Sequence, residues 1–449
     1  MPGPMDILLP DNVIRLLDAL ETAGFEAWVV GGAVRDLLLG RVAHDFDIAT
    51  VARPKQVAAL FPEATIGLGE RFGTVGVLSD GDLIEVTTYR AEGRYTDFRH
   101  PSEVKFADRI EDDLGRRDFT INALAYQHAR GLLDLFGGAD DLEAGVIRCV
   151  GDPDERFAED PLRILRAWRL AAQLGFSLED ATREACVRQA PLLRHLSAER
   201  IRDEFSRLLL ADPRTLQLMP REILDQFLPE LVTAFDTPQN TPYHCYSVGE
   251  HSIHACLQTP PDLRLRLATL LHDVGKPKAR FHREDGIDHF YHHPQYSAEI
   301  TREIMGRLRF SRRLTDEVCA LVSQHDRQVG ESDASLRRAV ASVGEELFGT
   351  LLQLKYADAG SVAEQYRAAR LASVAEIERR YQELRERELL IHTTAQLAID
   401  GRDLIGLGME PGPELGRVLD ALLDEVIEDP ELNTRAALME RAQSYLSGG

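Results

Sequence analysis

The segment over residues 29–50, VVGGAVRDLLLGRVAHDFDIAT, constrains the possible fold more than any other part of the chain. Adjacent glycines, Gly31 and Gly32, follow a short apolar run and precede a short helical pattern that ends at another glycine. A second apolar stretch then carries Asp45 and Asp47. Residues i and i+2 of a β-strand point to the same face, so we expect these two carboxylates to project together from one strand. The segment therefore predicts a strand, a glycine turn into a helix, and a second strand with paired carboxylates.

Two carboxylates this close repel each other unless a cation lies between them. Mg²⁺ is the expected cation, because it is commonly held by one or two carboxylates together with substrate phosphates. Gly31 and Gly32 would let the backbone approach a bulky anion, and a helix beginning near Ala33 would point its N-terminus at that anion. An isolated Asp-x-Asp is more often a solvated strand end, but here Arg35 and Asp36 precede it at a short distance. The pattern favours a site for a nucleoside triphosphate and its metal.

The composition fits a globular chain of 449 residues, with 44% hydrophobic and 28% charged residues and about three domains as a starting expectation. None of the five cysteines forms a C-x-x-C pair, so we expect reduced thiols in a cytoplasmic protein. The opening MPGPMDILLP does not read as a secretion signal, and no run approaches the ~18 apolar residues of a membrane span. The net charge of −22 disfavours loose binding to polyanions but is compatible with a confined basic groove.

The order of local patterns predicts four parts. Helical and strand-like segments mix over the first ~150 residues in the manner of an α+β domain. Nearly all of the remaining sequence has helical periodicity, including a histidine-rich region and a charged stretch, residues 361–391, that reads as one long helix or two. The predicted divisions are residues 1–150, 151–243, 244–360 and 361–449.

A second charged constellation occurs in RRDFTINALAY, residues 116–126. On a helix, Asp118 and Asn122 would share a face at i, i+4. The guanidinium of Arg116 or Arg117 suits phosphate, because it donates two hydrogen bonds in a planar fork. A helix start with a capping aspartate and solvated arginines explains this segment equally well.

A third constellation lies in RFAEDPLRILRAWRLAAQLGF, residues 156–176. Charged residues recur every three positions along the expected helix, and the set is Glu159, Asp160, Arg163, Arg166 and Arg169. An aspartate accepts hydrogen bonds and an arginine donates them, so the Asp160/Arg163 pair could read the polar edge of a nucleobase. In isolation, such a pattern is usually a surface ion pair that contributes a few tenths of a kcal/mol.

Together, these motifs resemble the class II tRNA nucleotidyltransferases and bacterial poly(A) polymerases. The matching segments are GGAVRD…DFD, EVTTYR, RRDFTINALAY, LFGGADDL and EDPLRILRAWRLAAQLGF, which occur in the family's order and spacing over residues ~25–215. The resemblance implies a polymerase-β-like nucleotidyltransferase head followed by an all-helical neck. It also implies that the substrates are the tRNA 3′ end, CTP and ATP, used without a nucleic-acid template.

The resemblance assigns roles residue by residue. It implies that Asp45 and Asp47 carry two Mg²⁺ ions and that Asp160 and Arg163 read cytosine and adenine, with Glu159 orienting them. Family members often use a third carboxylate on a neighbouring strand, for which Glu85 is the candidate; pairing with Arg90 or Arg71 is its alternative role. The expected nucleotide-binding set is Gly31, Gly32, Arg35, Asp36, Arg116, Asp118, Asn122, Glu159, Asp160, Arg163 and Arg166.

Members of this family add CCA, only the terminal A, or only CC. CC-adding members lack a flexible loop between the first carboxylate motif and the RRD motif, and here the corresponding residues 91–106 look intact. CC-only addition is therefore disfavoured, while CCA and A-only addition both stay open. Poly(A) polymerase activity is an alternative that the absence of a basic C-terminal tail disfavours.

A fourth constellation lies in the histidine-rich region. LLHDVGKP, around His272 and Asp273, resembles the signature of HD-family metal phosphohydrolases, and imidazoles with carboxylates suit a transition metal such as Ni²⁺ or Mn²⁺. The expected ligands are His251, His272, Asp273 and Asp358 for a first metal, with His293 and His325 for a second. We expect His254, His282 and His289 to be surface residues.

Two other interpretations stay open for the HD region and the head. The HD domain could be catalytically inert or only bind RNA. The whole protein could instead be an RNA-end phosphohydrolase whose head only binds tRNA, but a head without activity would be expected to lose Asp45 or Asp47, and both are present. The sequence does not indicate the oligomeric state.

Overall fold

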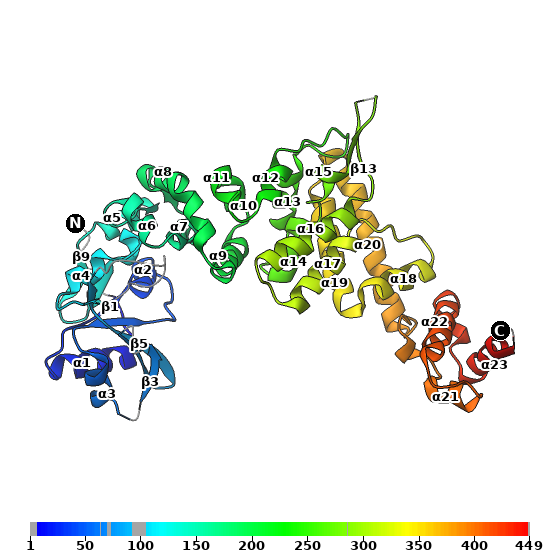
Figure 1. Ribbon diagram of the computed structural model, residues 1–449, viewed down its shortest axis with the longest axis horizontal. Coiled ribbons are helices and arrows are strands. Elements are labelled where there is room, and N and C mark those ends of the chain that lie inside the picture. Colours follow the sequence, from blue (N-terminus) through cyan, green and yellow to red (C-terminus); the bar gives the residue numbers. More distant parts are fainter. Residues whose placement is uncertain (1–6, 63, 70–72, 92–104, 285, 448–449) are drawn as a thin grey trace. The chain divides into compact units, whose positions relative to one another are not determined.

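The computed structural model describes residues 7–62, 64–69, 73–91, 105–284 and 286–447. It separates into two compact units, Met1–Phe227 and Leu228–Gly449 (Figure 1). The first unit keeps the predicted head together with most of the predicted neck, and the finer four-part division stays a prediction. No helix in the described part of the chain is long and apolar enough to cross a membrane.

A mixed sheet of seven strands forms the centre of the head, in the order β3-β4-β5-β2-β1-β8-β9. In that order the strands are Thr65–Gly69, Thr74–Ser79, Asp82–Thr88, Asp47–Thr50, Ala27–Val30, Leu124–Gln127 and Gly131–Asp134. Strands β2 and β5 are parallel, and the other neighbours are antiparallel. All four residues of β1 are buried, which fits its continuous apolar run and a sheet covered on both faces.

Four helices accompany the sheet: α1 (Asp11–Thr22), α2 (Gly32–Leu38), α3 (Pro54–Leu60) and α4 (Ile110–Gly115). Helix α1 buries Val13, Leu16, Leu17 and Leu20, which is the spacing of an amphipathic helix. Helix α4 adds Ile110 and Leu114 to a core formed with Trp28 and Val30 of β1 and with other sheet residues. These contacts hold β1 and β2 rigidly at the point where the glycine turn and the carboxylates meet.

The strand with the carboxylates is shorter than expected. Strand β2 begins at Asp47, so Asp45 lies in the irregular segment before it, and the prediction of a single strand with both residues was wrong. The loop used to argue against CC-only addition lies mostly outside the described residues. Only its two ends are described, where β6 (Arg90–Ala91) pairs with β7 (Lys105–Phe106).

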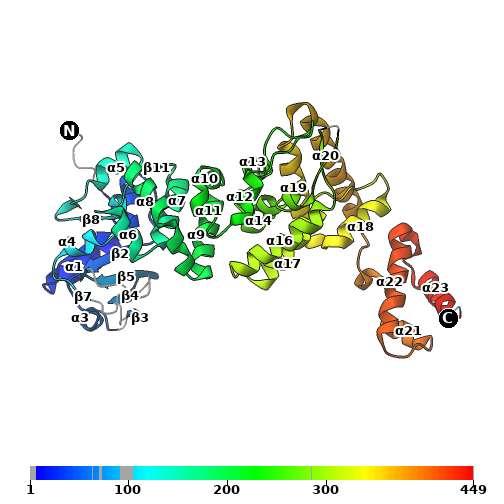
Figure 2. The same cartoon turned by 45° about the horizontal axis from the view of Figure 1, so that its top comes forward.

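The remainder of the first unit is helical, as expected, apart from two short paired strands, β10 (Val146–Ile147) and β11 (Ser177–Leu178). Helix α5 (Gly138–Ala144) precedes them. The other helices are α6 (Pro153–Glu159), α7 (Leu162–Leu174), α8 (Asp180–Gln189), α9 (Ala198–Ala211), α10 (Arg214–Leu218) and α11 (Arg221–Leu224). Helices α7 and α9 pack along each other (Figure 2), and Arg166 of α7 reaches Asp118 of the head.

The second unit is built mainly from helices, which are α12 (Pro229–Phe235), α13 (Val248–Cys256), α14 (Leu263–Leu271), α15 (Lys276–Ala279), α16 (His293–Arg307), α17 (Arg312–Gln324), α18 (Asp333–Val343), α19 (Glu345–Gly360), α20 (Glu364–Glu386), α21 (Gly401–Gly406), α22 (Pro413–Glu428) and α23 (Arg435–Ser447). One feature of this unit was not predicted, and another decides between two predicted alternatives. A hairpin of β12 (Arg280–His282) and β13 (Asp288–Phe290) interrupts the region expected to be helical. The charged stretch forms the single helix α20 rather than two helices.

Candidate functional site

The carboxylates of the head meet on neighbouring strands. Asp47 lies directly opposite Glu85 in the parallel pair of β2 and β5, so the two side chains share one face of the sheet. The pKa of Asp47 is raised to about 6: burial is the largest cause, the charge of Arg117 opposes it, and the charges of Glu85 and Asp45 add to it. A divalent cation would replace this repulsion with attraction, so the donor set fits Mg²⁺. This places Glu85, the candidate third carboxylate, beside Asp47.

The glycine turn brings an arginine close to these carboxylates. Gly31 has φ +77° and ψ −135°, a conformation that residues with a Cβ rarely adopt. A Cβ added there would lie 2.8 Å from Nη1 of Arg117. Arg117 therefore packs against the turn and acts electrostatically on Asp47. The expected set contained Arg116 and omitted Arg117, although both belong to the same motif.

Predicted residues from three distant segments form one hydrogen-bonded network. Arg35 donates through Nε to Asp36 Oδ1 and through Nη1 to Asn122 Oδ1, both at 2.8 Å. Asn122 donates through Nδ2 to Asp118 Oδ1 at 3.0 Å, and Arg166 Nη2 lies 2.9 Å from Asp118 Oδ2. Burial alone would raise the pKa of Asp118, but the charge of Arg166 and the hydrogen bonds hold it below its ordinary value. The network links the turn after β1 to α7.

The backbone that joins Asp118 to Asn122 is not an α-helix. A short 3₁₀ helix, Thr120–Asn122, follows a bend at Asp118 and still brings the two side chains together. The contact expected from i, i+4 spacing is therefore present, but the α-helical reason for it was wrong.

The pair predicted to read the base, Asp160 and Arg163, lies at a break between two helices. Helix α6 ends at Glu159 and α7 begins at Leu162, because Pro161 cannot donate a backbone hydrogen bond to continue a helix. The expectation of one continuous helix was wrong. Asp160 is nevertheless adjacent to the first turn of α7, and its backbone carbonyl accepts from the N–H of Arg163 at 3.0 Å.

The side chains of Asp160 and Arg163 have separate partners. Arg163 is buried; its Nη1 lies 2.7 Å from Glu159 Oε2, and its Nη2 donates to the carbonyl of Arg116 at 3.0 Å. Asp160 pairs with Arg200 of α9 at 2.9 Å. The expected role of Glu159 in orienting the pair is consistent with its contact to Arg163, whereas Arg200 was not expected from the sequence because it is 40 residues away.

Arg116 is held by a buried acid. Asp113 of α4 pairs with Nη2 of Arg116 at 2.6 Å and with Nη2 of Arg117 at 3.1 Å. Burial would raise the pKa of Asp113, but these two guanidinium groups hold it below the ordinary range. Asp113 thus fixes both arginines of the motif, and nothing in its sequence pattern distinguished it from its acidic neighbours in α4.

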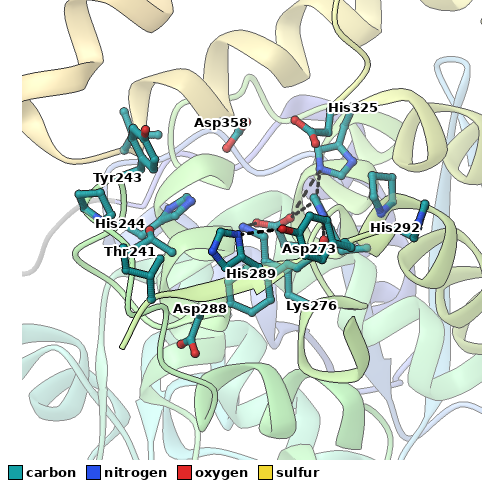
Figure 3. A pocket seen from close by; sticks show the side chains of 18 of the residues that line it. Thr241, Tyr243, His244, Asp273, Lys276, Asp288, His289, His292, His325 and Asp358 are labelled. Atoms are coloured by element: carbon teal, nitrogen blue, oxygen red, sulfur yellow. Dashed lines mark hydrogen bonds and ion pairs between the residues drawn. The ribbon is translucent and has the colours of Figure 1, made fainter. Parts of the chain in front are cut away.

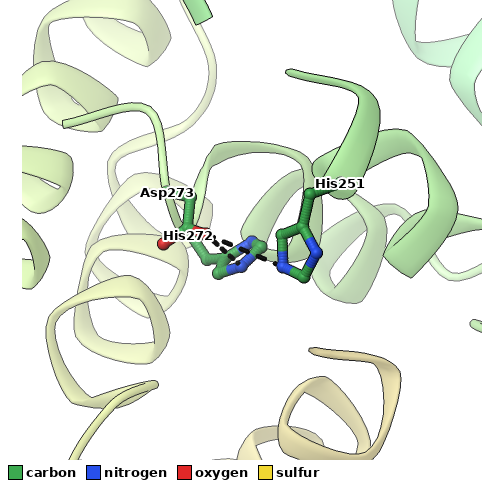
Figure 4. A group of neighbouring side chains, drawn as sticks. All are labelled: His251, His272 and Asp273. Atoms are coloured by element: carbon green, nitrogen blue, oxygen red, sulfur yellow. Dashed lines mark ion pairs between the residues drawn. The ribbon is translucent and has the colours of Figure 1, made fainter. Parts of the chain in front are cut away.

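The second unit brings together all six predicted HD ligands. His251 lies in α13, His272 and Asp273 directly follow α14, His293 begins α16, His325 follows α17 and Asp358 lies in α19. Figure 3 shows His325 and Asp358 near Asp273, and Figure 4 shows His251 and His272 beside the same carboxylate. The carboxylate of Asp273 lies 3.1 Å from His272 Nε2 and 3.3 Å from His293 Nε2, and that of Asp358 lies 2.9 Å from His251 Nε2.

The imidazoles are oriented in the way that metal-binding histidines usually are. In each of His272, His293 and His325, Nδ1 lies 2.7–2.8 Å from a backbone carbonyl, which leaves Nε2 as the inward-facing acceptor. The Nε2 atoms of His293 and His325 face each other at 3.2 Å, an arrangement that brings two lone pairs together unless a cation or proton lies nearby. In the described part of the chain, His272 Nε2 and Asp273 Oδ1 are buried without a hydrogen bond. These donors fit a divalent transition metal.

Two ligand groups share one residue. His251, His272 and Asp273 form one compact group, and Asp273, His293 and His325 form the other. Asp358, predicted for the first metal, belongs to neither compact group, although it lies 2.9 Å from His251 Nε2, and Asp273 belongs to both groups. The assignment of two metals stays a prediction. The charges of His272 and Lys276 overcome the effect of burial and hold the pKa of Asp273 well below its ordinary value.

A cavity of about 390 Å³ opens beside these ligands. Lys276 lines it, with Nζ 2.7 Å from Asp273 Oδ2 and 2.8 Å from Gln239 Oε1. His244 also lines it, and burial, reinforced by the charge of Lys276, lowers its pKa to about 3. Neither residue was in the predicted set, although Lys276 follows Asp273 by three residues in the same motif.

The three histidines expected at the surface have different environments. His282 is exposed and pairs with Asp288 at 2.9 Å. His254 is half-buried and stacks on Tyr246. His289 is half-buried and lines the cavity, where β13, a strand of the unpredicted hairpin, positions it.

Comparisons with known proteins agree with the architecture. The model described as "Poly A polymerase head domain" matches residues 27–148, "Probable RNA and SrmB- binding site of polymerase A" matches 175–235, and a model of tRNA nucleotidyltransferase domain 2 matches 282–442. The CCA-adding enzyme of Leuconostoc mesenteroides is 36% identical over 96% of both chains, and that of Geobacillus thermodenitrificans is 35% identical over 96% of this chain and 97% of its own.

Solved structures give the same result. The crystal structure of Bacillus stearothermophilus CCA-adding enzyme in complex with CTP has a TM-score of 0.73 and 29% identity, covering 98% of this chain and 100% of its own. A Thermotoga maritima CCA-adding enzyme shares the fold at a TM-score of 0.59 and 21% identity, covering 98% of this chain and 97% of its own. The fold and the head site define a nucleotidyltransferase. The chain belongs to the family of CCA-adding enzymes, which confirms the family predicted from the motifs.

Proposed function

We propose that this protein adds CCA to the 3′ end of tRNA from CTP and ATP, without a nucleic-acid template. The observation that carries the proposal is the site of the head, where Asp45, Asp47 and Glu85 lie close together beside an arginine-lined glycine turn. Relatives that match over nearly the whole chain are CCA-adding enzymes, which favours CCA over terminal A alone or poly(A). Extension of tRNA transcripts with CTP and ATP tests this function directly.

The reaction is a nucleotidyl transfer. The 3′ oxygen of the RNA forms a bond to the α-phosphorus of the nucleotide, the bond to pyrophosphate breaks, and the hydroxyl proton is released. Mg²⁺, bound to Asp45 and Asp47 with Glu85 adjacent, would supply Lewis-acid stabilisation of the charge that develops on the oxygens. Arg117 and Arg35 lie beside the turn where the triphosphate would bind, and their guanidinium groups suit its oxygens.

Selection between nucleotides is assigned to Asp160 and Arg163. The two residues are adjacent at the α6–α7 break, and Glu159, Arg200 and the backbone fix their orientation. A carboxylate that accepts and a guanidinium that donates can satisfy the edges of cytosine and adenine. Fixed positions matter here, because no template base supplies the selectivity.

Replacing Arg163 with alanine should reduce discrimination against UTP and GTP, or collapse incorporation of every nucleotide. We expect a change of about tenfold to a hundredfold, since a hydrogen bond to a charged group contributes about 1.5–3 kcal/mol. The measurement is the ratio of kcat/KM for CTP to that for UTP in single-nucleotide extension. Arg169→Ala is the matched control, because Arg169 lies on the same helix but pairs with Glu204. Unchanged selectivity and rate in the Arg163 variant would remove this residue from base reading.

We also propose that the HD region, residues 244–360, is a metal-dependent phosphohydrolase. The supporting observation is the convergence of six predicted ligands from five separate segments, five of them in the two compact groups and Asp358 beside His251, with three imidazoles fixed through Nδ1. A divalent transition metal held by these residues would supply an activated water and neutralise phosphate charge. Lys276 adds a fixed positive charge at Asp273. An inert domain that needed histidines only for packing would not require this set.

The proposed substrate is a tRNA 3′ end blocked by a phosphate or a 2′,3′-cyclic phosphate. In the cyclic case, water oxygen bonds to phosphorus, the bond between phosphorus and O3′ breaks, and O3′ takes up a proton. The hydroxyl that the head must extend is thereby restored, with a 2′-phosphate that a second hydrolysis removes. Hydrolysis of p-nitrophenyl phosphate and of cyclic nucleotides, with Mn²⁺, Ni²⁺ or Mg²⁺ and with a chelator, tests the activity.

We also propose that the protein is cytoplasmic and that its four predicted parts, residues 1–150, 151–243, 244–360 and 361–449, are separate functional domains. The five cysteines are free, and four of them are buried, which fits a reducing compartment.

A further inference from the structure

The mouth of the HD cavity carries aromatic and cationic side chains that the proposed metal chemistry does not use. Tyr243, Tyr291 and Arg370 all line the cavity that Asp273 and Asp358 also line (Figure 3). The two tyrosines are 44% and 53% exposed, so each presents ring surface to solvent. Exposed aromatic rings beside a polar cavity call for a ligand with an apolar face.

The first side of the mouth combines an aromatic ring with a guanidinium. Arg370 of α20 lies over the ring of Tyr243 at 5.7 Å, and Tyr243 also packs at 4.7 Å against Tyr366. Arg370 forms no ion pair with a carboxylate in the described ranges, unlike most arginines of this unit. The guanidinium of Arg370 can therefore donate hydrogen bonds to an anion, and its packing on Tyr243 restricts its conformation.

The other side belongs to the hairpin of β12 and β13. Tyr291 follows β13 and stacks parallel to His289, with ring centroids 5.5 Å apart. Arg283 donates to the hydroxyl of Tyr291 at 3.2 Å, which fixes the edge of the ring and adds positive charge beside it. The hairpin thus presents a flat π surface next to cations, at a cavity whose floor contains Lys276.

We propose that Tyr243, Tyr291 and Arg370 form a recognition rim that binds a nucleoside phosphate, with the base stacked on tyrosine and an adjoining phosphate bound by Arg370. This proposal depends on the proposed phosphohydrolase activity, and it identifies the residues that select the substrate of that activity. Aromatic stacking accepts every base, because every base has a π face, so the rim selects nucleotides over simple phosphate esters with little preference among bases. A terminal nucleotide of RNA fits this chemistry whatever its sequence.

The test measures equilibrium binding of adenosine and cytidine 2′,3′-cyclic monophosphates to the full-length protein by isothermal titration calorimetry, with a chelator present so that the nucleotides are not hydrolysed during the titration. Tyr291→Ala and Tyr243→Ala should each weaken binding of both nucleotides by about fivefold or more, which is the typical loss when the stacking of one base is removed. Arg370→Gln should weaken binding by about tenfold or more, because the phosphate loses a charge-assisted hydrogen bond. Tyr291→Phe keeps the ring and should bind within about threefold of wild type. Thermal unfolding of each variant checks that the fold is retained.

Matched controls come from the same elements. Phe281→Ala removes another exposed aromatic residue of the hairpin, and Arg367→Gln removes an arginine one turn before Arg370; neither residue lines the cavity. Both controls should bind the nucleotides as wild type does. Equal weakening in the controls, or unchanged binding in the rim variants, overturns the rim, as does a wild-type protein that binds neither nucleotide.

Hydrolysis of p-nitrophenyl phosphate by the wild type separates the two proposals, because this compound lacks a nucleoside. Hydrolysis without rim-dependent nucleotide binding refutes the rim and leaves the phosphohydrolase intact. Rim-dependent binding without hydrolysis in any metal refutes the phosphohydrolase and supports the rim as a binding site for nucleotide ends.

Discussion

Replacing Asp47 with alanine is expected to reduce nucleotide addition by about 10³-fold or more, because the change removes a carboxylate that we propose holds the catalytic metal. Asp45→Ala should have a comparable effect. The measurement is the single-turnover rate of CTP incorporation into a tRNA transcript at saturating Mg²⁺. Asp82→Ala is the control, since Asp82 lies at the start of the neighbouring strand β5 and bonds to Asn12 instead.

The same Asp47 variant should not lose stability. The pKa of Asp47 is raised to about 6, so above that pH the folded, metal-free protein carries an ionised carboxyl that folding disfavours. Removing this group should leave the melting temperature at pH 7.5 unchanged or slightly higher. A variant that is inactive but unfolded would point to a structural role, and a variant with near-normal turnover would refute the assignment.

Asp273→Asn is expected to abolish hydrolysis of cyclic nucleotides and p-nitrophenyl phosphate while nucleotide addition continues. Asparagine keeps the shape of the side chain but removes the charge that faces His272, His293 and Lys276. We expect a loss of about 10²-fold or more in hydrolysis, together with loss of bound transition metal after dialysis, measured by elemental analysis. Asparagine is preferable to alanine, because its amide oxygen can still accept a hydrogen bond from the buried Lys276, whereas alanine offers no acceptor at this position.

Asp326→Asn serves as the control for this variant, since Asp326 lines the same cavity but belongs to neither compact ligand group. It should retain the metal. Equal hydrolysis by wild type and Asp273→Asn, or no hydrolysis with any metal, favours the inert-domain interpretation. Loss of nucleotide addition together with hydrolysis would contradict the independence of the two sites.

Local spacing predicted much of the head site. The glycine turn, the short helix after it and the convergence of Asp118 with Asn122 follow from neighbours in the sequence. The exact start of β2 could not be predicted in this way, because strand pairing with β1 and β5 decides which residues are extended. Periodicity along α7 also hid the break at Pro161, although proline itself was the available signal.

Contacts between distant segments were beyond spacing alone. The pairing of Asp160 with Arg200 depends on how α9 packs against α7. Asp113 lies only four residues before Arg117, but its burial, which singles it out from the neighbouring acids of α4, comes from the tertiary packing of α4. The separations of the six HD ligands in the sequence do not indicate that they converge in space. Their convergence was therefore predicted only from the resemblance to HD-family phosphohydrolases. The rim of the cavity was missed, since it depends on the β12–β13 hairpin and on one turn of α20.

The central claim is that this chain builds the tRNA 3′ terminus without a template. The most direct measurement gives the purified protein three tRNA transcripts, one lacking CCA, one ending in CC and one complete, with CTP and ATP singly and together, and resolves the products at single-nucleotide length. The account predicts two additions with CTP alone and three with both nucleotides on the first transcript, one addition with ATP on the second, and none on the third. If the protein extended only the CC-ending transcript, by one A, and left the transcript lacking CCA unextended, it would be an A-adding enzyme. Long A tracts, or no extension of any transcript, would contradict the account.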